Sequence, residues 1–236
     1  MRRLRGFAVL AMLAALALSG CQTAPDQALS VGDVSLTNAE IDAAAGEFEA
    51  ARVASAAPGT PPITNEDRAF LRQYLVQATI FNEVARRYAE EQSIPAPTPD
   101  FADAAVRLGL AEDHLFVRTV ATNEAYQELL LGRVPAAQPT EEDLHDAYDR
   151  YVQAATAAGV EPVDFETIKQ ELQATPQYSA GIGLRNALAE AVERYGVTVS
   201  PRYQPLEVPV WSAPNSRLVL VALEIGDQAD AVRDLG

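Results

Sequence analysis

Two histidines, His114 and His145, are the side chains of this sequence best suited to metal binding or proton transfer. On a helix, Glu141 and Asp149 would lie one turn to either side of His145, so the three side chains would share a face and could hold a metal ion. Acid-rich helix surfaces are more often only solvated, and we therefore predict no metal site there. His114 also stands among charged residues and is predicted to lie on the surface.

Other patterns that could support catalysis or cofactor binding are weak. Gly181-Ile182-Gly183 is too short for a phosphate-binding loop and follows no predicted strand. Cys21 is the only cysteine, so no internal disulfide can form. No serine or cysteine lies in a recognisable nucleophile motif. We therefore predict a protein that is not an enzyme, with no catalytic residue, metal or cofactor.

The amino-terminal residues form a separate segment. Three arginines lie among the first five residues, and the apolar run that follows, residues 7–18, is too short to span a bilayer comfortably. Leu18-Ser19-Gly20-Cys21 resembles the lipobox of bacterial lipoproteins, whose cysteine is lipidated and becomes the first mature residue. The resemblance implies cleavage between Gly20 and Cys21, with 1–20 as signal peptide and 21–27 as tether. An ordinary cleaved signal with a chance cysteine is the alternative.

Lipidation and charge together restrict the location and the partners. Two acyl chains give stable anchoring, at ~0.8 kcal/mol per buried CH₂, so we expect a protein anchored at the outer, extracytoplasmic face of a bacterial cell membrane. The net charge is −15, and it becomes −18 without the three arginines of the signal peptide. This field disfavours nucleic acid and anionic lipid head groups as partners.

A long amphipathic helix is predicted over Thr64–Gln92, where apolar residues recur every three or four positions. Capping signals and apolar periodicity predict further helices over 37–56, 101–108, 111–131, 140–158, 164–175 and 182–195, with Pro176 interrupting the last two. Short β segments are expected at 28–36, 197–199, 207–211 and 217–225. The fold class is therefore mainly α, with a small sheet formed by strands from both termini. Residues 28–226 would be one domain, and 227–236 a disordered tail.

Five segments occur in an order that resembles a known family. They are residues 31–41 (VGDVSLTNAEI), the central helix, 139–148 (PTEEDLHDAY), 165–172 (FETIKQEL) and 197–203 (VTVSPRY). In this order they resemble the opening segment, the two central helices, the carboxy-terminal helix and the closing strand of SurA- and PrsA-type extracytoplasmic chaperones. The resemblance implies a helical chaperone core that binds unfolded or newly exported polypeptides.

The sequence also departs from that family. Asp33 and Ser200 match the usual asparagine-containing positions only loosely, and Gln204 stands where glycine is usual. Only residues 151–165 separate the segments that flank the family's parvulin domain, whereas such a domain needs on the order of a hundred residues. The resemblance therefore implies a chaperone core without prolyl isomerase activity.

Aromatic residues on the predicted helices are the candidates for a client-binding cleft. Most of them are expected to be core residues, because each lies on an apolar helical stripe. The candidates are Tyr74, Phe81, Phe116, Tyr126, Tyr148 and Tyr151. The alternative function is that of a cell-envelope scaffold lipoprotein that binds one folded partner. The sequence leaves the oligomeric state open.

Overall fold

The computed structural model describes residues 26–57, 59–213 and 218–226, and over these the chain is mainly helical, as predicted. The helices are α1 (Asn38–Ser55), α2 (Asn65–Glu91), α3 (Phe101–Leu108), α4 (Leu115–Leu131), α5 (Glu141–Ala157), α6 (Phe165–Gln173) and α7 (Pro176–Tyr195). The strands are β1 (Gln27–Val31), β2 (Val34–Thr37), β3 (Val197–Val199), β4 (Leu206–Ser212) and β5 (Val219–Ile225). A 3₁₀ turn, Pro201–Tyr203, lies between β3 and β4.

The long helix α2 forms where the sequence predicts it. Thr64 caps its amino terminus, and Thr64 and Asp67 bond reciprocally in a capping box, which satisfies backbone N–H groups that have no partner within the helix. Its buried residues lie on several sides, because α1, α4, α7, β1 and β4 all pack against it. The helix is therefore the centre of the core.

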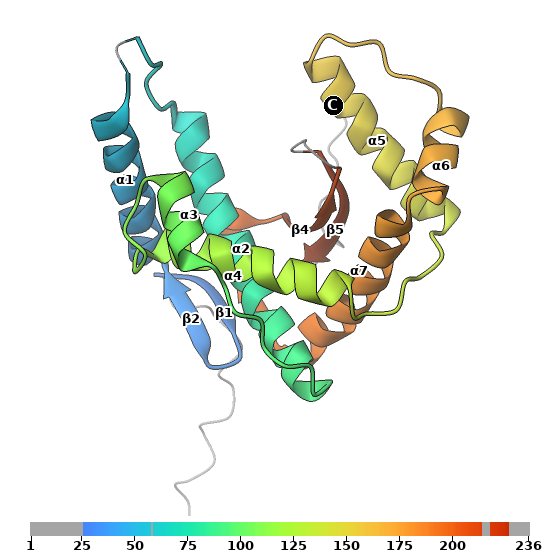
Figure 1. Ribbon diagram of the computed structural model, residues 1–236, viewed down its shortest axis with the longest axis horizontal. Helices are drawn as coiled ribbons and strands as arrows, with labels where there is room; N and C mark the ends of the chain where they lie inside the picture. The colour runs from blue at the N-terminus through green and yellow to red at the C-terminus, as the bar shows by residue number, and fades with distance from the viewer. Residues whose placement is uncertain (1–25, 58, 214–217, 227–236) are drawn as a thin grey trace, which may run out of the picture.

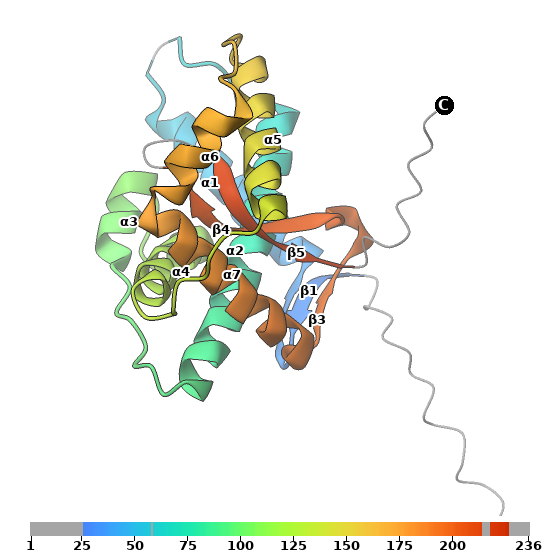
Figure 2. The same cartoon turned by 90° about the vertical axis from the view of Figure 1, so that its right-hand side faces the viewer.

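Strands from both ends of the domain share one sheet. In the order β2-β1-β3, β1 pairs antiparallel with both neighbours, and Leu29 lies opposite Val199 (Figure 2). This confirms the predicted fold class. The two remaining strands were expected in the same sheet. Instead, they pair with each other in the antiparallel β4–β5 hairpin.

The β4–β5 hairpin is buried between helices. Residues 220–223 of β5 are all buried, so both faces of this strand are covered; α5 and α7 pack against β5, and α2 and α7 pack against β4. Its apolar run, VLVALEI, is the pattern expected of a strand covered on both faces.

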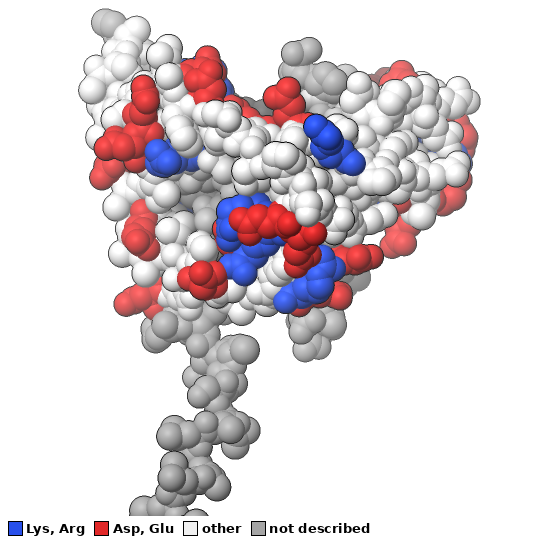
Figure 3. Space-filling view, turned by 60° about the horizontal axis from the view of Figure 1, so that its bottom comes forward, with Lys and Arg blue, Asp and Glu red and all other residues white. Residues whose placement is uncertain are grey.

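The molecule has two arms that diverge from this hairpin (Figure 1). We define the first arm as α1, α3 and the amino-terminal half of α2, and the second arm as α5 and α6. Helix α4 crosses between them near the base, and α7 supports the second arm (Figures 1 and 2). The space-filling view shows a notch between the arms at its upper edge, and mixed acidic and basic side chains over the face toward the viewer (Figure 3).

Two helix starts differ from the predicted ones. Helix α4 begins at Leu115, not near residue 111, because the His114 ring accepts a hydrogen bond from the Phe116 N–H and caps the helix. Pro176 begins α7 instead of interrupting a helix: it occupies a first-turn position, where its missing N–H costs no hydrogen bond.

Candidate functional site

One face of α2 forms the wall of the first arm toward the opening between the arms. Phe70, Tyr74, Gln77 and Phe81 follow one another at steps of three or four residues and therefore share this face. The Gln77 amide donates to the backbone oxygen of Glu207 on β4, at 2.6 Å, so the face points toward the hairpin. Phe70 and Tyr74, nearer the outer end of the helix, lie above that contact.

Apolar exposure on this face increases toward its outer end. Phe81 is 1% exposed, Tyr74 is partly buried, and Phe70 is 56% exposed. The Phe70 and Tyr74 rings stack with 6.4 Å between centroids, and Tyr74 in turn stacks on Phe116 at 5.7 Å. Burial raises the pKa of Tyr74 to about 12, so its phenol stays neutral. The three stacked rings therefore extend from the solvent-exposed Phe70 to the buried Phe116.

Glu207, at the base of the opening, contacts both arms. Its backbone oxygen accepts from Gln77 of α2, and its carboxylate lies 2.5 Å from the Arg150 guanidinium of α5. Arg150 also contacts Asp146, one turn earlier, at 2.9 Å. Burial lowers the pKa of Arg150, but its hydrogen bonds to Glu207 and Asp146 outweigh this effect and raise it, so the arginine stays charged. The second arm therefore contributes a charged group, Arg150, to the contact with Glu207.

Exposed valines lie near the outer ends of both arms. Val53 lies in the last turn of α1 and is 63% exposed, while Val160 and Val163 lie between α5 and α6. The α1–α2 and α5–α6 connections lie at the tops of the two arms in Figure 1. Single exposed valines are ordinary on a protein surface. Among the described residues, Phe70 is the only aromatic side chain in the set of exposed large apolar residues.

The predicted cleft residues have three different environments. Phe81, Phe116 and Tyr126 are in the core, each no more than 5% exposed, and are not accessible to a client. Tyr148 and Tyr151 hold the α5–α6 connection: the Tyr148 hydroxyl donates to the Val163 oxygen, and the Tyr151 hydroxyl accepts from the Val163 N–H. Tyr74 is partly buried and stacks on both Phe70 and Phe116.

Sequence reasoning did not separate Phe70 from the other aromatic residues of the stripe. In the sequence, Phe70 widens the apolar face of α2 in the same way as Leu75 and Val84, which are both fully buried in the structure. The difference is that Phe70 lies only in the second turn of α2, above the level at which α4 and the hairpin cover the helix. The short distance from the helix start is the only sequence signal that could have indicated this exposure.

Both histidines serve structure. His145 stacks on Phe165 of α6, with 4.1 Å between ring centroids. The side chain of His114 is only 9% exposed, so the predicted surface position is wrong; its Nε2 lies 2.9 Å from the Glu47 carboxylate on α1, while its Nδ1 caps α4. Over the described residues, no three His, Cys, Asp or Glu side chains are grouped to hold a metal ion.

Gly181 and Gly183 of α7 allow neighbouring segments to pack closely against this helix. A Cβ added at Gly181 would come within 2.9 Å of Trp211 on β4, and one at Gly183 would lie 2.1 Å from the Pro135 oxygen. The chain before α5 and the hairpin therefore both approach α7 at these two positions. The pair marks close packing.

Residues 1–25, which contain Gly20 and Cys21 of the proposed lipobox, lie outside the described residues, as does the predicted tail 227–236. Within the described ranges, no helix is both long enough and apolar enough to cross a membrane.

No protein-family model, curated protein or solved structure matches this chain. The resemblance to SurA- and PrsA-type chaperones therefore stays a prediction from the order of the sequence motifs.

Proposed function

We propose that this chain is a lipid-anchored, extracytoplasmic chaperone-like protein that binds unfolded or newly exported polypeptides between its two arms, without prolyl isomerase activity. The observation that supports this most is Phe70, 56% exposed on the inner face of α2 and stacked on Tyr74. An apolar segment that covered this ring would gain roughly 1–2 kcal/mol from its burial. Because apolar burial is non-directional, such binding would not depend on one client sequence.

The anchor is the second part of the proposal. The lipobox-like residues 18–21 and the short apolar run before them support lipidation at Cys21. A chaperone held at the membrane surface would meet exported chains as they emerge. Replacing Cys21 by Ser in the full chain is expected to release the protein from the membrane fraction; a Cys21→Ser variant that stays membrane-bound would refute the anchor.

A scaffold role is the second candidate, and one observation favours it. Glu207 links α2 and α5 through two hydrogen bonds of 2.5–2.6 Å, which fixes the spacing of the arms at their base. A fixed opening suits one folded partner better than many different segments. A single stoichiometric partner recovered after crosslinking in the envelope, together with no affinity for unrelated unfolded proteins, would favour this role.

The chaperone proposal is tested by suppression of aggregation. The form without residues 1–21 keeps every described element and is added in several-fold molar excess to a reduced, unfolding client whose light scattering is followed. The Phe70→Ser variant is expected to suppress aggregation several-fold less well than the unsubstituted form. Val106→Ser is the matched control, because Val106 is 84% exposed on α3.

Three results bear on the outcome. Loss of suppression in Phe70→Ser alone supports binding between the arms. Equal loss in both variants would indicate nonspecific contact with exposed apolar groups and would contradict the proposed site. No suppression by the unsubstituted form would reject the chaperone function itself.

A further inference from the structure

A small pocket of about 210 Å³ lies between α2 and the turn that follows β3. Helix α2 contributes Arg72 and Gln73, and the turn contributes Arg202, Tyr203 and Gln204. Its volume is below that of pockets for drug-sized ligands, so it fits a small molecule or the end of a larger one. Two arginines and two amides make its lining rich in hydrogen-bond donors.

The two arginines of this pocket share one carboxylate, that of Asp42 on α1. The Arg72 Nε donates to Asp42, and the Arg202 guanidinium lies 3.6 Å from the same oxygen, beyond hydrogen-bond distance. The terminal nitrogens of both guanidinium groups make no hydrogen bond to any described residue. The local charge is therefore +1 in a strongly acidic molecule.

Other arginines that form ion pairs are more completely neutralised. Five of them, among the described residues, each contact two carboxylates: Arg86, Arg87, Arg107, Arg150 and Arg194. Even where Arg86 and Arg87 share Glu83, each has a second acid of its own. Arg72 and Arg202 differ from these arginines because the two of them share a single acid, Asp42.

A second observation comes from Tyr203, which lines the same pocket. Its side chain is buried, at 7% exposure, and its hydroxyl makes no hydrogen bond to any described residue. A buried polar group without a partner costs free energy, so an acceptor atom that reached this hydroxyl would remove that cost. Burial raises the pKa of Tyr203, so the hydroxyl keeps its proton and can donate.

We propose that this pocket binds a carboxylate group between Arg72 and Arg202. A planar guanidinium donates two parallel N–H groups to the two carboxylate oxygens, which a round or tetrahedral anion matches less well. The carboxylate can belong to a free small acid or to the carboxy terminus of a polypeptide.

The test compares acids with their amides by isothermal titration calorimetry, using the form without residues 1–21. The probes are N-acetylglycine, an N-acetylated alanine tripeptide, the carboxamide of each, and inorganic phosphate. We expect the acids to bind at least about tenfold more tightly than the carboxamides, since a hydrogen bond to a charged group contributes about 1.5–3 kcal/mol. Arg202→Gln should weaken acid binding by a similar factor, whereas Arg133→Gln, at an exposed position outside the pocket, should not.

Each outcome decides the proposal or the source of the carboxylate. Binding of both acids supports a general carboxylate site, and binding of the peptide acid alone supports recognition of a polypeptide terminus. Equal binding of acids and carboxamides, tighter binding of phosphate, no acid binding at millimolar concentration, or unchanged binding by a folded Arg202→Gln variant would each overturn it. None of these results depends on the aggregation assay, so this site and the proposed function fail separately.

Discussion

Gly183 determines how closely the chain before α5 can approach α7. The Ala137 N–H donates to the Ser179 oxygen at 3.0 Å, and this contact holds the Pro135 carbonyl over the glycine. A Cβ at Gly183 would lie only 2.1 Å from that oxygen and 3.1 Å from the Ala137 nitrogen. Both neighbours are backbone atoms, so no side-chain rotation can relieve the clash.

We predict that Gly183→Ala lowers the free energy of unfolding by about 3 kcal/mol, because the linker must move away from α7. Gly46→Ala is the control: Gly46 lies in α1 with no atom near its added Cβ, and alanine there should stabilise the helix by about 0.5–1 kcal/mol. Urea unfolding followed by circular dichroism measures both. Equal stability of the two variants would mean that the linker does not pack on α7 in solution.

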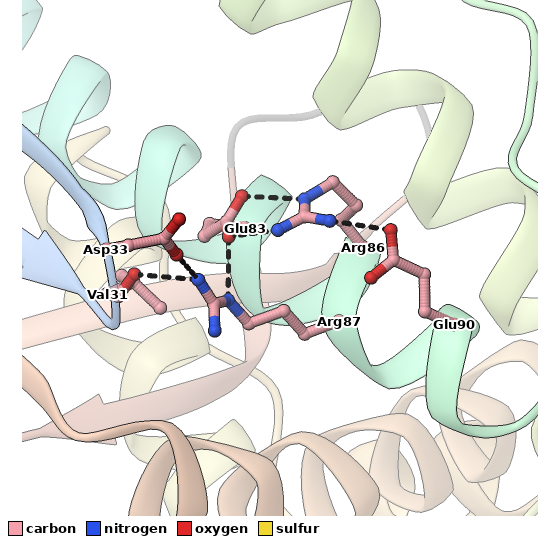
Figure 4. A network of polar contacts seen from close by, with 6 residues as sticks. All are labelled: Val31, Asp33, Glu83, Arg86, Arg87 and Glu90. Carbon is pink, nitrogen blue, oxygen red and sulfur yellow. Dashed lines mark hydrogen bonds and ion pairs between the residues drawn. The ribbon is translucent and has the colours of Figure 1, made fainter.

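At the scale of the elements, an ionic network attaches α2 to the β1–β2 turn (Figure 4). Glu83 is 8% exposed and accepts hydrogen bonds from both Arg86 and Arg87. Arg87 also donates to the Asp33 carboxylate and to the Val31 backbone oxygen at the β1–β2 turn. The Arg87 guanidinium lies against Gly32, where a Cβ would come within 2.7 Å of it. The network thus holds the terminal sheet on the central helix.

This network gives stability a pH dependence that can be measured. Burial raises the pKa of Glu83, but hydrogen bonds from Arg86 and Arg87 outweigh burial and bring it below its ordinary value of 4.5. The folded state therefore binds this proton less readily than the unfolded state, so the stabilisation is complete above about pH 4.5 and is lost as the pH falls through the folded pKa.

Glu83→Gln is expected to lower the free energy of unfolding at pH 7 by about 1–3 kcal/mol and to make its decrease below pH 4.5 shallower. Denaturant unfolding at a series of pH values between 3 and 7 tests this. Glu66→Gln, on the exposed first turn of the same helix, is the control. An unchanged acid slope in Glu83→Gln would show that other carboxylates carry the whole effect.

For the molecule as a whole, the two-armed shape and the net charge would both affect which partners bind. Two arms diverge from a buried hairpin, and the mature chain would carry a net charge of −18. Such a field attracts basic partners from beyond contact distance and repels acidic ones. Under the proposed chaperone function, the field would select clients by charge before Phe70 contacts them.

We predict that raising the ionic strength from 0.01 M to 0.5 M slows association with a basic unfolded client by about tenfold, because salt shortens the range of the attraction. An acidic unfolded client of similar length should associate somewhat faster at high ionic strength than at low ionic strength. Stopped-flow fluorescence with labelled clients measures both rates. Equal salt dependence for the two clients would contradict electrostatic selection.

The sequence by itself determined where most elements begin and end. Thr37, Thr64, Thr140 and Asp164 cap helices as predicted, and Gly109 and Gly196 end helices in the left-handed conformation that glycine adopts without strain. These are interactions between residues a few positions apart, so local spacing contains the information. The joining of terminal strands followed from their composition and from their places at both ends of the domain.

Only the tertiary structure decided which apolar side chains stay uncovered and which distant charges meet. Phe70 and Phe81 lie on the same helical face, but one is 56% and the other 1% exposed, because the covering residues come from α4 and β4. Likewise Arg72 and Arg202, far apart in the chain, line one pocket. Periodicity reports which face of a helix is apolar; what packs on that face depends on contacts between segments that local spacing does not encode.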